Sequence, residues 1–295
     1  MASAARSGAA AAVMAAVAML SLATAGSAQL QQGFYKGKCN GTDVEAVVRG
    51  IVKSWFVRKT PSSAPTLTIR GDVVNAELER RCPGVVSCSD IQILATRDAV
   101  ALGGGAAYPV RTGRRDRRRS LAYDVRLPAP DYTAAQTTAY YGRLGLSAFD
   151  AVLLLGAHTV GATRCSAIKS SRLYAYGGRP GATDPGVDPA TASVYKRYVC
   201  PNVASSDGNV VFLDDQWSAL RVDNHYYRNL QLRRGVLPCD QNLYKDGSTR
   251  WIVDLLANDA GLFTSLFPQA LVKLSEVNVL TGTQGEIRKV CNRFN

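Results

Sequence analysis

The chain has 295 residues and a formal net charge of +12, which is enough length for one large globular domain or for two packed lobes. The positive charge favours polyanionic partners such as acidic polysaccharides or nucleic acids. After the N-terminal segment, no stretch is long and uncharged enough to cross a bilayer, which excludes an integral membrane protein.

The N-terminal segment has the order of a secretory signal peptide. Arg6 precedes an Ala-rich apolar run at residues 9–25, and Gly26-Ser27-Ala28 precedes the polar Gln29. A membrane span is the competing interpretation, but no stop-transfer charge cluster follows the run. We therefore expect a cleaved signal at residues 1–28 and a soluble, secreted protein without nucleic acid or membrane partners.

Helix signals dominate the sequence that follows. The pattern Thr42-Asp43-Val44-Glu45 predicts a capping box that opens an amphipathic helix. A second helix is expected at about residues 71–81, and Ser87 is expected to cap a third, which stops at Gly103-Gly104-Gly105. The apolar positions of the first helix are Val47, Val48, Ile51, Val52 and Trp55.

The most apolar helix is expected after Ser147, which forms a capping pattern with Asp150, and it should end near His158. Helical periodicity returns across residues 250–274, while strand-like alternation is scarce. Long loops that contain Pro and Gly are expected around residues 104–131 and 173–190. These signals predict an all-α fold without internal repeats.

The cysteines of a secreted chain should be oxidised, which here gives three disulfides and one leftover thiol. Metal binding is the competing interpretation, but the sequence has no CxxC pair, and neither His158 nor His225 lies close to a cysteine in sequence. Asn40-Gly41-Thr42 is also a glycosylation sequon, a motif that is common by chance. The seven cysteines are Cys39, Cys82, Cys88, Cys165, Cys200, Cys239 and Cys291.

A series of short motifs is spread over most of the chain. The motifs are Gly33-Phe34-Tyr35 with Cys39, the run from Cys82-Pro83-Gly84 to Cys88-Ser89-Asp90, Gly113-Arg114-Arg115-Asp116, Leu127-Pro128-Ala129-Pro130, Gly156-Ala157-His158-Thr159-Val160-Gly161, Cys200-Pro201, Asp223-Asn224-His225-Tyr226-Tyr227, Asp240-Gln241 and Gly285-Glu286-Ile287-Arg288. Together and in this order, they resemble the class III plant haem peroxidases. The resemblance implies an all-α haem peroxidase fold, with two helical lobes around a haem crevice. Residues 29–295 would form one peroxidase domain, with a truncated distal part at 29–145 and a mainly proximal haem and calcium part at 146–295.

His158 matches the family's proximal ligand of haem b, and Asp240 matches the buried Asp that accepts the other imidazole N–H. A carboxylate in that position makes the axial ligand electron-rich. Taken alone, His158 would be read as a core histidine and Asp240 as an ordinary turn residue. The resemblance reverses both interpretations.

Thr159 and the segment that ends at Asp223 supply hard oxygen donors and resemble the family's proximal Ca²⁺ site. The matching positions are Thr159, Asp215, Ser218, the carbonyl of Arg221, and Asp223. Asp214 would take the place of Asp215 if the loop has shifted by one residue. An exposed acidic loop is the alternative interpretation.

Further assignments follow from the resemblance alone. The disulfides would join Cys39 with Cys82, Cys88 with Cys291, and Cys165 with Cys200. Cys239 stands where the family has Ser and is left unpaired. Pro128 matches a position that contacts the donor substrate, and Asp90 with Arg114 matches a structural ion pair.

The segment that should carry the distal catalytic residues is missing. In the family a helix with Arg, His and a further Cys lies between the first two disulfide cysteines. Here Cys39 and Cys82 are 43 positions apart, roughly half the family interval, with neither His nor Cys between them. We therefore expect no distal acid–base pair and no distal Ca²⁺ site. Arg58 or Lys59 could supply positive charge, but His225 follows the calcium residues and is not expected to act as the distal base.

The resemblance implies an extracellular, monomeric peroxidase that uses H₂O₂ to oxidise phenolic donors in the cell wall, in wall phenolic chemistry or the response to oxidative stress. The missing segment predicts crippled turnover. One alternative is a noncatalytic secreted protein that binds haem or acidic wall polysaccharide. Others are a chain that does not fold stably and the product of a mis-spliced or mispredicted transcript.

Overall fold

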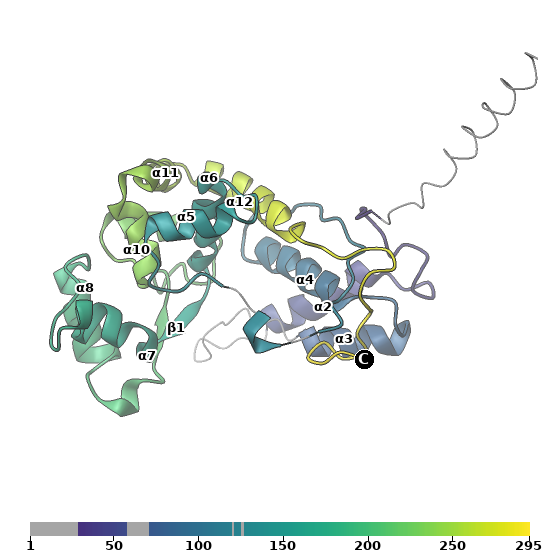
Figure 1. Cartoon of the computed structure of the whole chain (residues 1–295), viewed down its shortest axis with the longest axis horizontal. Coiled ribbons are helices and arrows are strands. Elements are labelled where there is room, and N and C mark those ends of the chain that lie inside the picture. Colours follow the sequence, from purple (N-terminus) through teal and green to yellow (C-terminus); the bar gives the residue numbers. More distant parts are fainter. Residues whose placement is uncertain (1–28, 58–70, 120, 125–126) are drawn as a thin grey trace, which may run out of the picture.

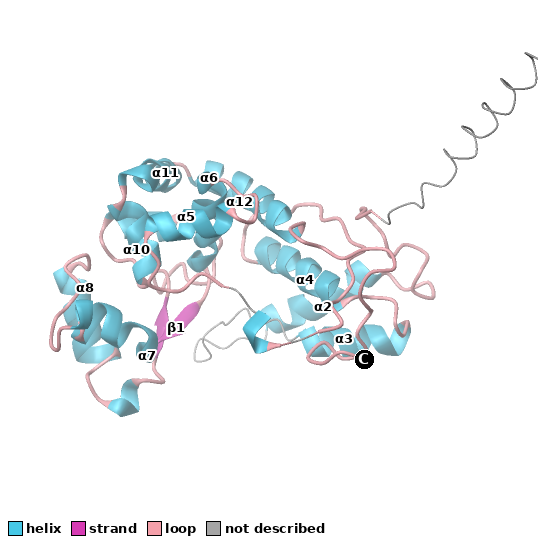
Figure 2. Cartoon of the chain, viewed as in Figure 1, coloured by secondary structure: helices cyan, strands magenta, loops and turns pink. Residues whose placement is uncertain are grey.

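The computed structural model describes residues 29–57, 71–119, 121–124 and 127–295. The expected signal peptide lies outside these residues, as do Arg58, Lys59 and the sequence that follows them up to residue 70. In the described residues the regular secondary structure is nearly all helical, with only two short strands, which confirms the predicted all-α class (Figure 2). Helices gather in two lobes, and α12 lies on the side of the second lobe that faces the first (Figure 1).

The helices of the first lobe are α2 (Val44–Val57), α3 (Gly71–Arg81) and α4 (Cys88–Leu102). Those of the second lobe are α5 (Ala134–Gly142), α6 (Ala148–Leu155), α9 (His225–Gln231), α10 (Pro238–Lys245), α11 (Gly247–Asn258) and α12 (Ala260–Ser275). A subregion beside it contains α7 (Cys165–Ile168), α8 (Pro189–Val194) and the antiparallel pair β1 (Ala162–Arg164) and β2 (Val210–Phe212), with Thr163 opposite Val211. Short 3-10 turns occupy Ala122–Asp124, Gly156–Thr159, Tyr176–Gly178 and Ala204–Ser206, and π turns occupy Lys169–Tyr174 and Tyr195–Val199.

The first lobe forms as its sequence signals predict, apart from the first cap. Ser87 Oγ accepts the Asp90 N–H and starts α4, which ends before Gly103. At α2 the cap is wrong in detail, because the Asp43 carboxylate accepts the Ala46 N–H while Glu45 pairs with an arginine of α4. The amphipathic face of α2 packs on α4, and α3 closes the same core.

The second lobe is built around α6, which packs against α5, α11 and α12. The helical stretch expected at residues 250–274 is two helices, because Asp259 adopts an extended conformation between them. Its side chain accepts the Leu262 N–H and so starts α12. Within the described residues, none of the helices combines the length and the apolar character that a membrane span requires.

Each of the two hydrophobic cores includes residues from both sides of position 145. Ala134 of α5 belongs to the core around α6, although it precedes that boundary. Cys291, close to the C-terminus, packs against the first core and is bonded to Cys88. The C-terminal segment therefore returns to the first lobe, as Figure 1 shows.

Candidate functional site

His158 stands at the end of the most apolar helix of the second lobe. Ser147 and Asp150 form the predicted capping box, in which each side chain accepts the backbone N–H of the other residue. After Leu155 the helix tightens into the 3-10 turn Gly156–Thr159, which carries His158. Burial of α6 thus fixes the position of the imidazole.

Gly156 lets this turn pack closely against α9 and α12. A Cβ at position 156 would collide with the Tyr227 hydroxyl and would lie 2.7 Å from the Phe263 ring. Its backbone is helical, so close packing rather than an unusual φ angle is what requires glycine here.

His158 is paired with Asp240 from the first turn of α10. Nδ1 of His158 lies 2.9 Å from Oδ1 of Asp240, whose side chain is fully buried. A carboxylate only accepts hydrogen bonds, so Nδ1 carries the proton and Nε2 is free to bind a ligand. Burial lowers the pKa of His158, but the charge and hydrogen bond of Asp240 outweigh it and raise that pKa above its ordinary value. The imidazole remains 31% exposed.

Two more groups approach the same carboxylate oxygen. Tyr226 donates its hydroxyl to Asp240 Oδ1 at 2.9 Å, and Cys239 Sγ lies 3.8 Å from it. Asp240 Oδ2 is buried and has no hydrogen-bond partner within the described part of the chain. Burial and the charge of Asp240 raise the pKa of Cys239, which keeps this thiol protonated.

A cluster of oxygen atoms lies next to the iron-ligand candidate, around Thr159. Its hydroxyl is 3.0 Å from Asp214 Oδ2, 3.0 Å from the Arg221 carbonyl and 3.5 Å from Asp223 Oδ1. One hydroxyl has one hydrogen to donate, so only one of these three acceptors can receive it and the others approach the Thr159 oxygen without a hydrogen between them. Ser218, which lies between Asp214 and Arg221 in the sequence, has a buried hydroxyl. That hydroxyl has no hydrogen-bond partner among the residues described.

This oxygen cluster suits Ca²⁺, because that ion prefers several hydroxyl, carbonyl and carboxylate oxygens. Burial raises the pKa of Asp214 to about 6, and the charges of Asp223 and Asp215 act in the same direction. No group of three or more His, Cys, Asp or Glu side chains converges in metal-binding geometry in the described ranges. A site made partly of Ser, Thr and carbonyl oxygens does not depend on such a group.

The sequence left open whether Asp214 or Asp215 belongs to the oxygen cluster, and the structure distinguishes them. Asp214 is buried and contacts Thr159, while its other oxygen accepts from Asn229. Asp215 is half-buried and contributes its carbonyl to the backbone turn at Ser218. Asp214 is therefore the carboxylate that meets the cluster, one position earlier than the family spacing implies.

All seven cysteines lie in the described residues, and their pairing matches what the resemblance implied. The disulfides are Cys39–Cys82, Cys88–Cys291 and Cys165–Cys200. Cys239 is the free, buried thiol.

Pro128 lies in the loop that leads to α5 and is half-buried. Two residues later, the Pro130 carbonyl accepts the Cys239 N–H at 2.9 Å, which ties this loop to the start of α10. Pro128, the residue predicted to contact the phenolic substrate, therefore lies on a loop that is hydrogen-bonded to α10, the helix that carries Asp240.

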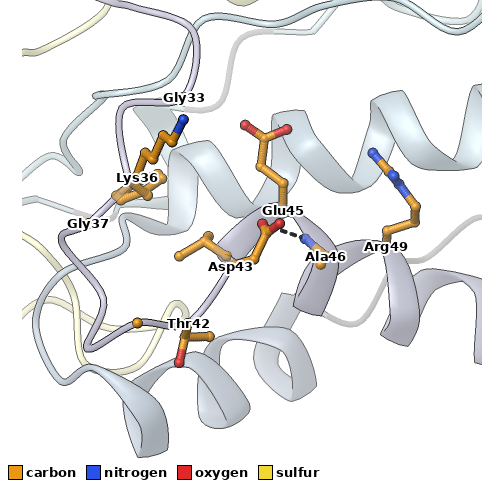
Figure 3. Close-up of a pocket in the computed structure, with 11 residues that line it drawn as sticks. Gly33, Lys36, Gly37, Thr42, Asp43, Glu45, Ala46 and Arg49 are labelled. Carbon is orange, nitrogen blue, oxygen red and sulfur yellow. Dashed lines mark hydrogen bonds between the residues drawn. The ribbon is translucent and has the colours of Figure 1, made fainter.

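The first lobe contains a polar pocket of about 410 Å³ at the start of α2 (Figure 3). Its two acidic side chains are already committed, because Asp43 caps α2 and Glu45 pairs with Arg97. His225, the second histidine, lies in the other lobe, where its backbone N–H donates to Asp223. The pocket therefore provides no free base to replace the distal histidine, and His225 lies beside Asp223 rather than in this pocket.

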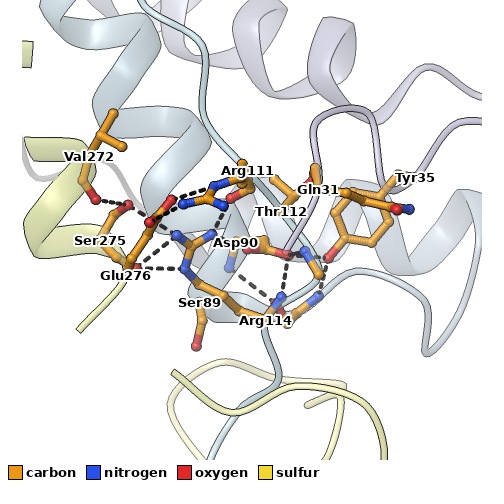
Figure 4. Close-up of polar contacts among 12 residues, drawn as sticks. Gln31, Tyr35, Ser89, Asp90, Arg111, Thr112, Arg114, Val272, Ser275 and Glu276 are labelled. Carbon is orange, nitrogen blue, oxygen red and sulfur yellow. Dashed lines mark hydrogen bonds and ion pairs between the residues drawn. The ribbon is translucent and has the colours of Figure 1, made fainter. Parts of the chain in front are cut away.

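Asp90 and Arg114 form the expected buried ion pair, with 2.9 Å between Nη1 and Oδ1 (Figure 4). Tyr35 also donates to Asp90, while Arg114 donates to the carbonyl of Ser275 at the end of α12. The network joins the N-terminal segment, α4 and α12 and thereby holds the two lobes together. It touches none of the proximal residues, which agrees with a structural role.

The contact between Tyr226 and Asp240 was not predicted. Its motif was part of the resemblance, but a tyrosine after a calcium-site aspartate carries no local signal that its hydroxyl reaches α10. A buried tyrosine hydroxyl needs a hydrogen-bond partner, and this requirement is the one signal that could have indicated the contact.

Comparison with known proteins gives a consistent set of relatives. A family model described as Peroxidase matches residues 63–259. Peroxidase 57 of Arabidopsis thaliana is 39% identical over 303 residues, which cover 91% of this chain and 93% of the relative. Peroxidase P7 of Brassica rapa is 39% identical, with 79% of this chain and 76% of the relative covered. Peroxidase 45 of Arabidopsis thaliana is 34% identical over 317 residues, covering 94% and 95%.

Two of these alignments, of 303 and 317 residues, are longer than the whole chain of 295 residues. The relatives therefore contain residues that have no counterpart in this chain. This agrees with the short interval between Cys39 and Cys82.

Proposed function

The chain belongs to the class III plant haem peroxidases, and we propose that it holds haem b through Nε2 of His158 while lacking the distal residues needed for rapid turnover. The pair formed by His158 and Asp240 carries this proposal. A neutral imidazole, protonated on Nδ1 towards a buried carboxylate, is an electron-rich ligand for iron. When bound, haem supplies the redox-active iron for oxidation of phenolic donors by H₂O₂.

The residues around the proposed haem site fit that group. The imidazole is 31% exposed although the helix behind it is buried, and Asp240 occupies only its Nδ1, which leaves Nε2 for a ligand. Asp240 is held by Tyr226 as well as by His158, which prevents the carboxylate from turning away. Pro128, on the loop tied to α10, is the proposed contact for a phenolic donor.

Turnover is proposed to be slow because a general base is missing. Cleavage of the O–O bond needs a group that moves a proton between the two oxygens and a cation that stabilises charge. The chain has two histidines: His158 is the proposed axial ligand, and His225 is bonded through its backbone to Asp223 of the proposed calcium site, on the proximal side. General acid–base catalysis typically contributes about 10²–10⁴-fold to a rate.

We also propose a single Ca²⁺ site beside the axial ligand. Thr159, Asp214, Ser218, the Arg221 carbonyl and Asp223 would hold the ion, with Asp215 as the alternative carboxylate. The unpartnered Ser218 hydroxyl and the crowded oxygens at Thr159 support this assignment. Because Thr159 follows His158 directly, an ion bound there would steady the turn that presents the imidazole.

The setting proposed for the protein is extracellular, as a monomer in the plant cell wall. The signal-like N-terminus and the disulfides support secretion. The net charge of +12 supports attraction to acidic wall polysaccharide.

The second candidate function is a noncatalytic secreted protein that binds haem or wall polysaccharide. The absence of a distal histidine from the sequence favours it. The two candidates share the His158 site and differ only in whether a bound haem oxidises donors. The helices α2, α3 and α4 enclose a packed core. This core supports stable folding, which both candidate functions require, and argues against the hypothesis that the chain is unstable.

The experiment is reconstitution of the full secreted chain with haem and Ca²⁺, followed by its Soret spectrum. We expect a Soret band at one haem per chain, and its loss in His158→Ala. His225→Ala is the matched control, because it removes the other histidine of the chain, and it should keep the band. A Soret band that survives unchanged in His158→Ala contradicts the axial assignment.

A further inference from the structure

We propose that Tyr226 is a positioning residue that controls how strongly Asp240 accepts the proton of His158, and thereby how much electron density His158 gives to iron. The inference rests on the proposed haem function and adds a residue to it.

The geometry starts from one shared oxygen. Oδ1 of Asp240 lies 2.9 Å from Nδ1 of His158 and 2.9 Å from the hydroxyl of Tyr226. Oδ2 of the same carboxylate has no partner within the described residues. The Cys239 thiol also approaches Oδ1, at the longer distance of 3.8 Å, so the two close donors His158 and Tyr226 share one oxygen with a third, weaker donor.

Burial and ring packing hold the Tyr226 hydroxyl in this position. Tyr226 is 1% exposed and Asp240 is fully buried, so solvent does not replace a lost hydrogen bond. The Tyr226 ring packs edge-on against Tyr227 at 4.9 Å and against His158 at 6.2 Å between ring centroids. These contacts keep the hydroxyl on Oδ1.

The chemical consequence has a definite direction. A carboxylate oxygen that already accepts one hydrogen bond has less charge to offer a second donor. The Tyr226 hydroxyl therefore weakens the pull of Asp240 on the Nδ1 proton and moderates the anionic character of His158. Without that hydroxyl, the imidazole should become a stronger donor to iron and should favour the ferric state.

Tyr227 provides a matched control on the next residue. It is also fully buried, but its hydroxyl donates to the carbonyl of Val152 at 3.1 Å instead of to Asp240. Tyr227→Phe removes the same atom from the same helix without removing a donor to Asp240.

The test is the iron–histidine stretching frequency of the reconstituted ferrous protein, measured by resonance Raman spectroscopy together with the Fe(III)/Fe(II) midpoint potential. In Tyr226→Phe we expect a higher frequency and a lower potential. Replacing Tyr226 with 3-fluorotyrosine keeps the hydroxyl and makes it a stronger donor, so both quantities should shift the opposite way. Tyr227→Phe should leave the frequency unchanged.

The outcomes separate this inference from the proposed function. Failure of the unmodified protein to take up haem, or an unaltered frequency in Asp240→Asn, contradicts the His158 and Asp240 site itself. If that site holds, but the Phe and 3-fluorotyrosine variants leave the frequency unchanged or shift it in the same direction, the role of Tyr226 is wrong. The fluorinated variant keeps the test decisive if Tyr226→Phe folds poorly.

Discussion

His158 and Asp240 are 82 positions apart in the sequence and 2.9 Å apart in the structure. The resemblance predicted their roles, since neither residue has a local signal that separates it from a core histidine or a turn aspartate. The third member of the group, Tyr226, was not predicted, because its hydroxyl reaches Asp240 only through the packing of α9 on α10. At the scale of single residues, the resemblance pointed to the pair of His158 and Asp240, but not to the third contact from Tyr226.

Gly156 gives a residue-scale prediction about the support of the axial ligand. Gly156→Ala should lower stability by about 1–3 kcal/mol, because the methyl group meets the Tyr227 hydroxyl and Phe263 in a packed core. Thermal unfolding of the reconstituted protein measures the effect.

The control is Gly50→Ala in α2, where a Cβ would meet no atom within 4 Å. Alanine in a helix interior is favoured over glycine by about 0.5–1 kcal/mol, so this variant should be neutral or more stable. Equal melting temperatures for Gly156→Ala and the unmodified protein would show that the turn before His158 is not tightly packed.

At the scale of elements, local signals were reliable where local contacts decide the structure. Ser87 and Ser147 cap the helices that they were predicted to cap, because each cap involves residues three positions apart. The break at Asp259 was missed, since apolar periodicity continues through it. The choice between Asp214 and Asp215 depends on which side chain the loop turns towards Thr159, and sequence spacing does not specify that.

The oxygen cluster around Thr159 gives an element-scale prediction for Ca²⁺ removal. We expect a chelator to lower the melting temperature at about pH 7.5, because Ca²⁺ stabilises only the folded site. Asp214→Asn should abolish most of this difference, and Asp215→Asn should keep it. The reverse result would restore Asp215 as the ligand.

The pH dependence follows from Asp214. Its pKa is raised to about 6 from an ordinary value of 3.8, first by burial and then by Asp223 and Asp215, so the folded apo protein binds this proton more tightly than the unfolded chain. The contribution of Asp214 to apo stability is therefore present below about pH 4 and is lost as the pH rises through 6. Ca²⁺ needs the ionised form, so its stabilising effect should fade below pH 6. A calcium-dependent shift of equal size at about pH 5 and pH 7.5 would contradict the assignment.

At the scale of the whole molecule, two lobes remain joined although the segment between Cys39 and Cys82 is short. The disulfide Cys88–Cys291 and the network around Arg114 link the first lobe to the C-terminal segment and to α12. The family resemblance predicted the overall architecture, because its motifs extend over most of the chain. It did not predict that α2, α3 and α4 enclose a core of their own.

The central claim is that this molecule keeps the proximal half of a peroxidase site without a distal base. It is tested most directly by guaiacol oxidation per bound haem, measured beside a full-length relative that has the distal histidine. We predict a Soret band in both proteins and a turnover at least about 100-fold lower in this one, the lower end of the contribution expected from acid–base catalysis. Equal turnover per haem in the two proteins would contradict the account.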